Sequence, residues 1–137
     1  MLSMKRKRQK PRNKPYFCHD ENLEFLTLRK ICSKSARFIG AVEVTKKQGE
    51  KDPVLIRKCN EKDYHILTHN TVDFRSPLSK IKVGIICIGL KDEEVWMSKF
   101  SKMLRRLQNH ADYYHKTIYI ENIIRITDRR TGEIRLI

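Results

Sequence analysis

Apolar and polar positions follow two different periods along this chain, which predicts an alternation of strands and helices. Compact apolar runs and alternating positions predict strands over residues 16–19, 37–44, 64–68 and 82–90. Apolar residues spaced three or four positions apart predict helices over residues 22–33, 52–62 and 92–115. The run over 82–90 is apolar almost throughout, so we expect it to be a central strand that is buried on both faces.

The end of the chain has a different pattern. Residues 117–126 and 133–137 read as strands that pair in a hairpin across the polar turn 127–132. Upstream of the hairpin, strands that alternate with helices favour a parallel sheet with helices on its faces. We therefore predict a three-layer α/β/α sandwich with a mainly parallel central sheet, plus a C-terminal β-hairpin. A basic arm over residues 1–15 precedes a single domain over residues 16–137.

Composition narrows the class of protein. The chain has 137 residues, of which 39% are hydrophobic, enough for one packed core and too many for a generally disordered chain. The sequence contains no run of about 18 apolar residues, so it does not predict a membrane-spanning helix. The basic start lacks the apolar stretch of a secretory signal. We expect a cytoplasmic protein, or a nuclear one in a eukaryote. The cysteines lack metal-binding spacing, so we expect reduced core thiols at Cys18, Cys32, Cys59 and Cys87.

Charge points to a polyanionic partner. The formal net charge is +14, and residues 1–14 hold seven Lys and Arg with no acid, so the rest of the chain carries +14 − 7 = +7. A basic body favours phosphate-rich partners such as RNA, although basic surfaces also serve solubility alone. The side chains that we expect to contact nucleic acid are Lys5, Arg6, Lys7, Arg8, Arg75, Lys80 and Lys82.

Carboxylates stand where three of the predicted elements begin or end. Asp20 follows the first strand, Asp52 opens the middle helix, and Asp73 follows the third strand. Ligands collect at the carboxyl ends of strands in parallel sheets, and carboxylates beside polar groups suit a hard divalent cation. The polar groups that stand beside them are Thr68 and Asn70. Each acid also has a structural explanation: Asp52 as a helix cap, Asp73 as a turn residue, and Asp20 as a solvated residue.

The same three segments, in this order, resemble PIN-domain proteins. They are Asp20-Glu21-Asn22-Leu23, Asp52-Pro53-Val54-Leu55-Ile56 and Ile66-Leu67-Thr68-His69-Asn70-Thr71-Val72-Asp73-Phe74. The resemblance spans about residues 16–90 and is greatest to short standalone PIN-like proteins and to VapC-type toxin ribonucleases. The chain departs from many members in having Asn70 where they have Asp.

This resemblance implies a Mg²⁺- or Mn²⁺-dependent endoribonuclease. Asp20, Asp52 and Asp73 would be its catalytic and metal-binding residues, with Glu21, Thr68 and Asn70 in support. The cation would lower the pKa of a bound water that attacks the phosphodiester. The family also implies an antitoxin-like protein partner and a homodimer. Two other readings stay open: a non-catalytic nucleic-acid-binding module on a PIN-like fold, and a protein-interaction subunit whose acids only cap helices and shape turns.

Histidines and aromatic residues complete the expectations. His69 lies in the candidate active loop, where it either transfers protons or serves as a polar loop residue. We expect His110 and His115 at the surface, and Trp96 in the core or at a dimer contact. The adjacent tyrosines Tyr113 and Tyr114 fit packing better than the stacking of bases.

Overall fold

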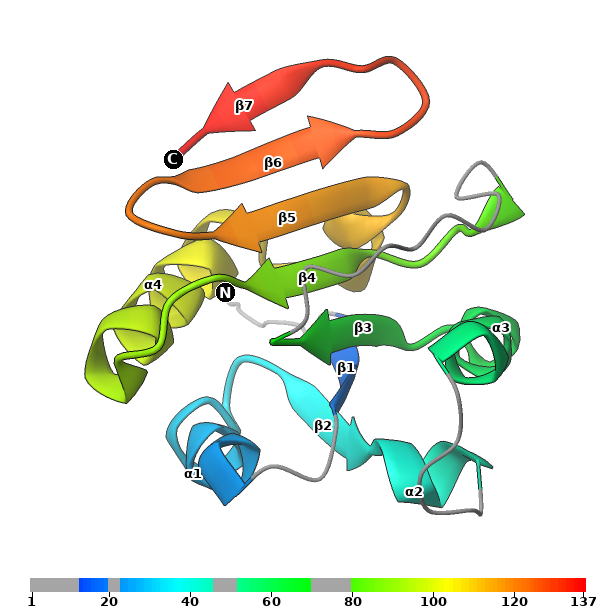
Figure 1. Ribbon diagram of the computed structural model, residues 1–137, viewed down its shortest axis with the longest axis horizontal. Helices are drawn as coiled ribbons and strands as arrows, with labels where there is room; N and C mark the ends of the chain where they lie inside the picture. The colour runs from blue at the N-terminus through cyan, green and yellow to red at the C-terminus, as the bar shows by residue number, and fades with distance from the viewer. Residues whose placement is uncertain (1–12, 20–22, 46–51, 70–79) are drawn as a thin grey trace, which may run out of the picture.

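The computed structural model describes residues 13–19, 23–45, 52–69 and 80–137, without the side chains of Leu23, Thr45, Asp52 and Pro53. Within these ranges seven strands form one sheet in the order β2-β1-β3-β4-β5-β6-β7 (Figure 1). The strands are β1 (Tyr16–His19), β2 (Arg37–Gly40), β3 (His65–Thr68), β4 (Ile85–Ile88), β5 (Lys116–Ile120), β6 (Ile124–Asp128) and β7 (Ile134–Leu136). The helices are α1 (Leu23–Ile31), α2 (Ala41–Thr45), α3 (Asp52–Lys62), α4 (Glu93–Arg106) and the short 3₁₀ helix η3 (His110–Tyr113).

The sheet is mainly parallel, as the alternation of strands and helices predicted. Strands β1 to β5 pair in parallel, whereas β5, β6 and β7 follow one another as an antiparallel meander. Every residue of β4 is buried, which confirms the expectation of a central strand covered on both faces. The chain therefore has an α/β fold built on a seven-stranded mixed sheet.

Two apolar cores lie on opposite faces of the sheet because neighbouring strand residues point to opposite sides. On one face, Phe17 of β1 and Leu67 of β3 belong to a core that includes side chains of α1 and α4, among them the fully buried Trp96. On the other face, Cys18 and Ile66 belong to a core that includes side chains of α2 and α3. Helices thus cover both faces of the sheet.

The expected strand over 37–44 is wrong in its second half. Strand β2 ends at Gly40, and α2 begins at the next residue. The carboxylate of Glu43 accepts a hydrogen bond from the backbone N–H of Gly40 at 2.9 Å, which satisfies a donor at the start of α2. The alternating apolar residues of 41–44 concealed this helix.

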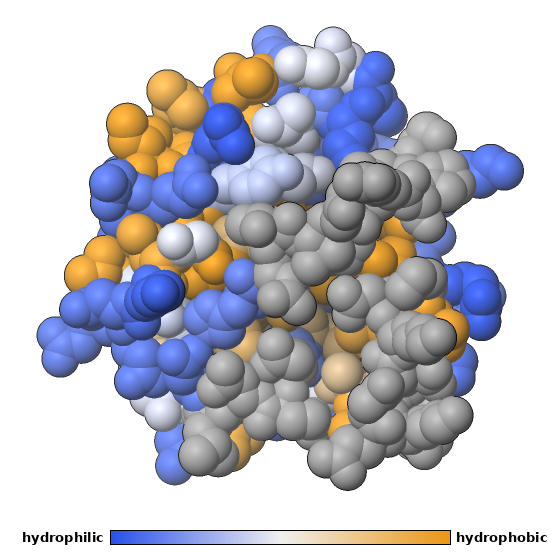
Figure 2. All heavy atoms as spheres, viewed as in Figure 1, coloured by the Kyte–Doolittle hydropathy of each residue, from blue (hydrophilic) through white to orange (hydrophobic). Residues whose placement is uncertain are grey.

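Other boundaries also differ from the sequence-based expectation, among them the strand expected over 82–90, which is shorter and limited to β4. The helix expected over 92–115 ends at Arg106, and the 3₁₀ helix η3 follows as a separate element. The strand expected over 117–126 is two strands, because a turn after Ile120 lets β6 fold back on β5. The final hairpin pairs β6 with β7. Figure 2 shows apolar surface over this hairpin, where Ile134 and Leu136 are exposed.

Gly84, just before β4, fits where a side chain does not. A Cβ atom at this position would lie 2.6 Å from the backbone oxygen of Tyr113, whereas one at the exposed Gly89 would lie 3.0 Å from the flexible side chain of Glu121. We expect Gly84→Ala to lower the free energy of unfolding by about 2–3 kcal/mol through overpacking. We expect Gly89→Ala to change it by less than about 1 kcal/mol. Urea denaturation of both variants tests this, and equal effects would contradict it.

Within the described ranges, no helix is long and apolar enough to cross a membrane.

Candidate functional site

The carboxyl ends of β1 and β3 lie side by side in the sheet. The register of these parallel strands pairs His19, the last residue of β1, with Leu67 of β3. The half-buried Thr68 then ends β3. The chain therefore leaves both strands at adjacent points. In the sequence, Asp20 directly follows β1 and Asn70 comes two residues after β3, and both lie outside the described residues. The meeting of the acids at this edge stays a prediction.

Most of the predicted site residues themselves lie outside the described part of the chain. These are Asp20, Glu21, Asn70, Asp73 and Arg75, together with Lys5, Arg6, Lys7 and Arg8 of the arm. Asp52 is described through its backbone only, as the first residue of α3. Since α3 ends two residues before Tyr64 leads into β3, Asp52 stands at the end of the helix that is remote from the amino end of β3. Among the described residues no group of three potential metal ligands occurs.

A histidine–carboxylate pair occupies the described part of this edge. The Nε2 atom of His69, which follows β3, lies 2.5 Å from the Oε1 atom of Glu24 in the first turn of α1. Their side chains are only 26% and 23% exposed, so water screens the contact incompletely. The pair joins α1 to the end of β3. It holds a carboxylate and an imidazole close enough for a proton to pass between them.

Aromatic rings hold this pair in place. The ring of Phe25 lies 5.3 Å from that of His69 and stacks on the buried ring of His19 at 5.0 Å. The fully buried Trp96 meets the His69 ring edge-on at 5.5 Å. His69 is therefore a packed residue of the edge as well as a polar one. Glu24 was missed in the sequence, although an acid in the first turn of a helix that follows β1 is a signal that could have found it.

Lys80 and Lys82 lie before β4, on the side of the amino ends of the parallel strands. Lys80 is exposed. The ammonium group of Lys82 lies 4.2 Å from the centre of the Tyr114 ring, which is a cation–π contact. The structure therefore places Lys82 at the edge of the sheet opposite to the ends of β1 and β3. Its predicted contact with nucleic acid stays a prediction.

His110, which the sequence led us to expect at the surface, is buried, with only 9% of its surface exposed. Its ring stacks on that of His65 at 4.0 Å. The spacing of apolar residues predicts a helix through residue 115, but α4 ends at Arg106, and η3 turns His110 inward. Tyr113 is fully buried, which confirms packing for that residue, whereas Tyr114 is half-buried.

All four cysteines are buried and none forms a disulfide, which confirms their assignment as core thiols. Burial raises the pKa of Cys87 to about 11, so this group remains a thiol at neutral pH.

Comparison of the chain with protein-family models, with curated proteins and with solved structures found no match.

Proposed function

We propose that this chain is a Mg²⁺- or Mn²⁺-dependent endoribonuclease with a PIN-like fold, acting at the carboxyl ends of β1 and β3. The observation that carries the proposal is the pairing of His19 with Leu67, which brings the strand ends before Asp20 and Asn70 together. The Glu24–His69 contact adds titratable groups at the same edge. The net charge of +14 suits a polyanionic substrate.

The donor set fits a hard divalent cation because it consists of oxygen ligands. Asp20, Asp52 and Asp73 would hold the cation, with Glu21, Thr68 and Asn70 in support. A bound cation supplies Lewis acidity and a more acidic water for hydrolysis of a phosphodiester. The protein itself contributes the pair of Glu24 and His69, in which the carboxylate orients the imidazole at the edge of the site.

Cleavage of a mixed-sequence single-stranded RNA by the purified full chain tests this function. We expect cutting with Mg²⁺ or Mn²⁺ and none with EDTA. Asp20→Asn and Asp73→Asn should each lower the rate about 100-fold or more, because each removes a ligand charge from the cation. Glu133→Gln changes an exposed acid in the β6–β7 hairpin and should cut at the normal rate.

Two outcomes would contradict the proposal. Cutting that survives in both aspartate variants would place the activity elsewhere or in a contaminant. RNA that binds but stays intact with every metal would favour the second candidate, a non-catalytic nucleic-acid-binding module, which the basic charge of the body supports. The proposal extends to a toxin covered by an antitoxin-like protein and to a homodimer, and co-purification with a neighbouring small protein tests that extension.

A further inference from the structure

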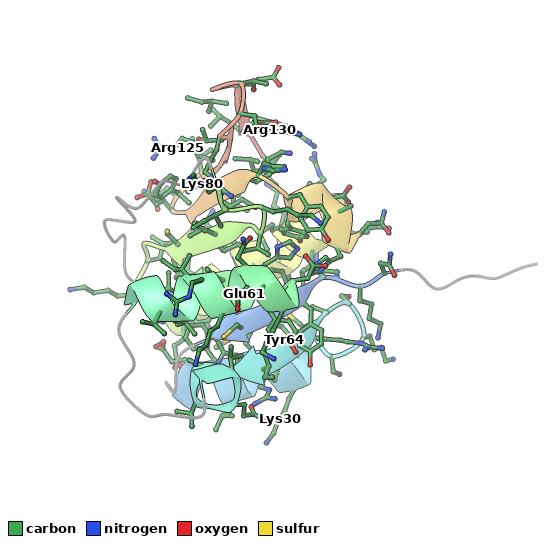
Figure 3. The ribbon with its side chains drawn as sticks, turned by 90° about the vertical axis from the view of Figure 1, so that its right-hand side faces the viewer. Lys30, Glu61, Tyr64, Lys80, Arg125 and Arg130 are labelled. Carbon is green, nitrogen blue, oxygen red and sulfur yellow. The ribbon has the colours of Figure 1, made fainter. Side chains whose placement is uncertain are left out.

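A second site lies at the opposite edge of the sheet. There the amino ends of β1, β2 and β3 surround a pocket of about 570 Å³. Figure 3 views this edge, with Tyr64 labelled below α3. Its volume falls within the range of small-molecule sites in proteins. The residues that line it are Asn13, Lys14, Tyr16, Arg37, Lys62, Asp63, Tyr64, His110, Ala111 and Tyr114.

The wall of the pocket is fixed by hydrogen bonds from several elements. Gly84 donates its backbone N–H to Nδ1 of His65 at 2.8 Å, so Nε2 of His65 carries the hydrogen that it donates to the His110 carbonyl at 2.9 Å. The backbone N–H of Tyr16 in turn donates to Nδ1 of His110 at 3.1 Å. This fixes the tautomer of neutral His110, with its hydrogen on Nε2.

The Nε2 atom of His110 is a buried donor without a hydrogen-bond acceptor among the described residues. It lies 3.4 Å from the carboxylate of Asp63, within ion-pair distance but outside hydrogen-bond geometry. That carboxylate already accepts the hydroxyl hydrogen of Tyr114 at 2.7 Å. A buried unpaired N–H is costly, and it is a ready donor to a ligand oxygen.

Charge at the pocket is strongly positive. Lys14, Arg37 and Lys62 line it and are exposed, whereas Asp63 is the one acid among its described lining residues. Asn13 and Lys14 also follow directly on residues 4–12, which hold six Lys and Arg. The densest positive charge of the sequence is therefore joined to this pocket, which favours a phosphate-bearing ligand.

Aromatic rings that line the pocket could contact the base of a nucleotide. The half-buried rings of Tyr16 and Tyr64 pack together with centres 4.6 Å apart, and both line the pocket. Tyrosine rings beside Lys and Arg are the combination by which proteins bind single strands: cations contact the phosphates and rings stack on the bases. An acidic peptide would use the cations but would leave the rings without a role.

We propose that this pocket binds one nucleotide of a single-stranded RNA, with its base against Tyr64 and its phosphate between Arg37 and Lys62. The inference goes beyond the proposed cleavage reaction, because it concerns the other edge of the sheet and holds whether or not the chain cuts RNA.

Binding of a fluorescein-labelled ten-residue oligouridine, followed by fluorescence anisotropy in EDTA, tests the role of the cations. We expect the double variant Arg37→Gln/Lys62→Gln to bind about tenfold more weakly and to lower the slope of log K against log salt by about 1.4. The matched control Lys102→Gln/Arg105→Gln removes the same charges from the exposed face of α4 and should bind within about twofold of the original chain. Equal losses in the two variants would overturn the proposal in favour of general charge attraction.

Tyr64→Leu tests the role of the ring while keeping an apolar side chain. We expect oligouridine to bind about tenfold more weakly to this variant, and an abasic strand of the same length to bind unchanged, because stacking needs a base. Circular dichroism confirms that the variant is folded. Unchanged oligouridine binding, or equal loss for both strands, would overturn the proposal. Polyglutamate that binds through Arg37 and Lys62 independently of Tyr64 would also overturn it, and would assign the pocket to an acidic protein. Because EDTA removes any cation, failure of cleavage leaves these results unaffected.

Discussion

Replacement of Arg129 by methionine is expected to lower the free energy of unfolding by about 3–5 kcal/mol. The guanidinium group donates to the carbonyl oxygens of Ile81 and Val83 at 2.8 Å each and to the Thr117 hydroxyl at 3.1 Å. It also donates to the carbonyl oxygen of Lys116. Methionine keeps much of the apolar stem but leaves these acceptors without the donor that joins the start of β4 to the β5–β6 hairpin.

Urea denaturation of Arg129→Met and Arg130→Met measures this effect. The neighbouring Arg130, which Figure 3 labels, is a matched control. Its side chain is 61% exposed and forms a 3.6 Å ion pair with Asp128. Such surface pairs contribute less than about 1 kcal/mol. A loss at position 129 as small as that at 130 would show that water replaces the guanidinium group at no cost.

Lowering the pH from 7 to 4 is expected to remove about 3 kcal/mol of stability through His65 alone. Burial, aided by the charge of the neighbouring His110 ring, lowers the pKa of His65 from 6.5 to about 3. The hydrogen bond to the His110 carbonyl and the charge of Asp63 have smaller, opposing effects. The unfolded chain therefore binds a proton below pH 6.5 that the folded chain does not bind until about pH 3. The contribution of neutral His65 to the free energy of unfolding is fully present above pH 6.5, and it falls as the pH is lowered from 6.5 toward 3. Protonation would also place a hydrogen on Nδ1 of His65, the atom that accepts the backbone N–H of Gly84. The two hydrogens would then face each other, and this hydrogen bond would be lost.

Thermal or urea denaturation between pH 7 and pH 4 tests this, with His65→Asn as the variant. We expect His65→Asn to be less stable at pH 7 but to depend less steeply on pH. The control is His115→Asn, which should keep most of the slope because His115 is partly exposed and asparagine tolerates its positive φ of 64°. Parallel pH profiles for the original chain and His65→Asn would assign the acid sensitivity to carboxylates instead.

The sequence predicted the parallel half of the sheet well. Strands buried on both faces give short apolar runs, and amphipathic helices give apolar residues spaced three or four positions apart. The strand at residues 16–19 was expected with the bounds that β1 has, and the helix expected over 52–62 matches α3. The antiparallel half was harder, since Ile118, Ile120, Ile124 and Ile126 recur at even positions on both sides of the short turn that separates β5 from β6, as they would in one continuous strand. No breaker such as Gly or Pro marks that turn.

Some features of the candidate site could likewise be predicted from the sequence, and others could not. Strand order and register follow from the alternation of elements, so the meeting of the ends of β1 and β3 could be expected. The contact of Glu24 with His69 could not, because it joins side chains 45 positions apart. The pocket at the other edge depends on the inward turn of His110 at η3. No local sequence pattern predicted that turn.

The order of the strands has a consequence for how the protein folds. The meander of β5, β6 and β7 forms from chain neighbours, whereas β1 must be inserted between β2 and β3, pairing Tyr16 with Arg37 and Phe17 with His65. Pairing of distant segments costs more loop-closure entropy and is slower than pairing of neighbours. We expect the meander to form early and β1 to dock late, although β1 leaves the ribosome first. Because both the carboxyl-end edge and the opposite pocket are built on β1, neither exists until that last docking step is complete.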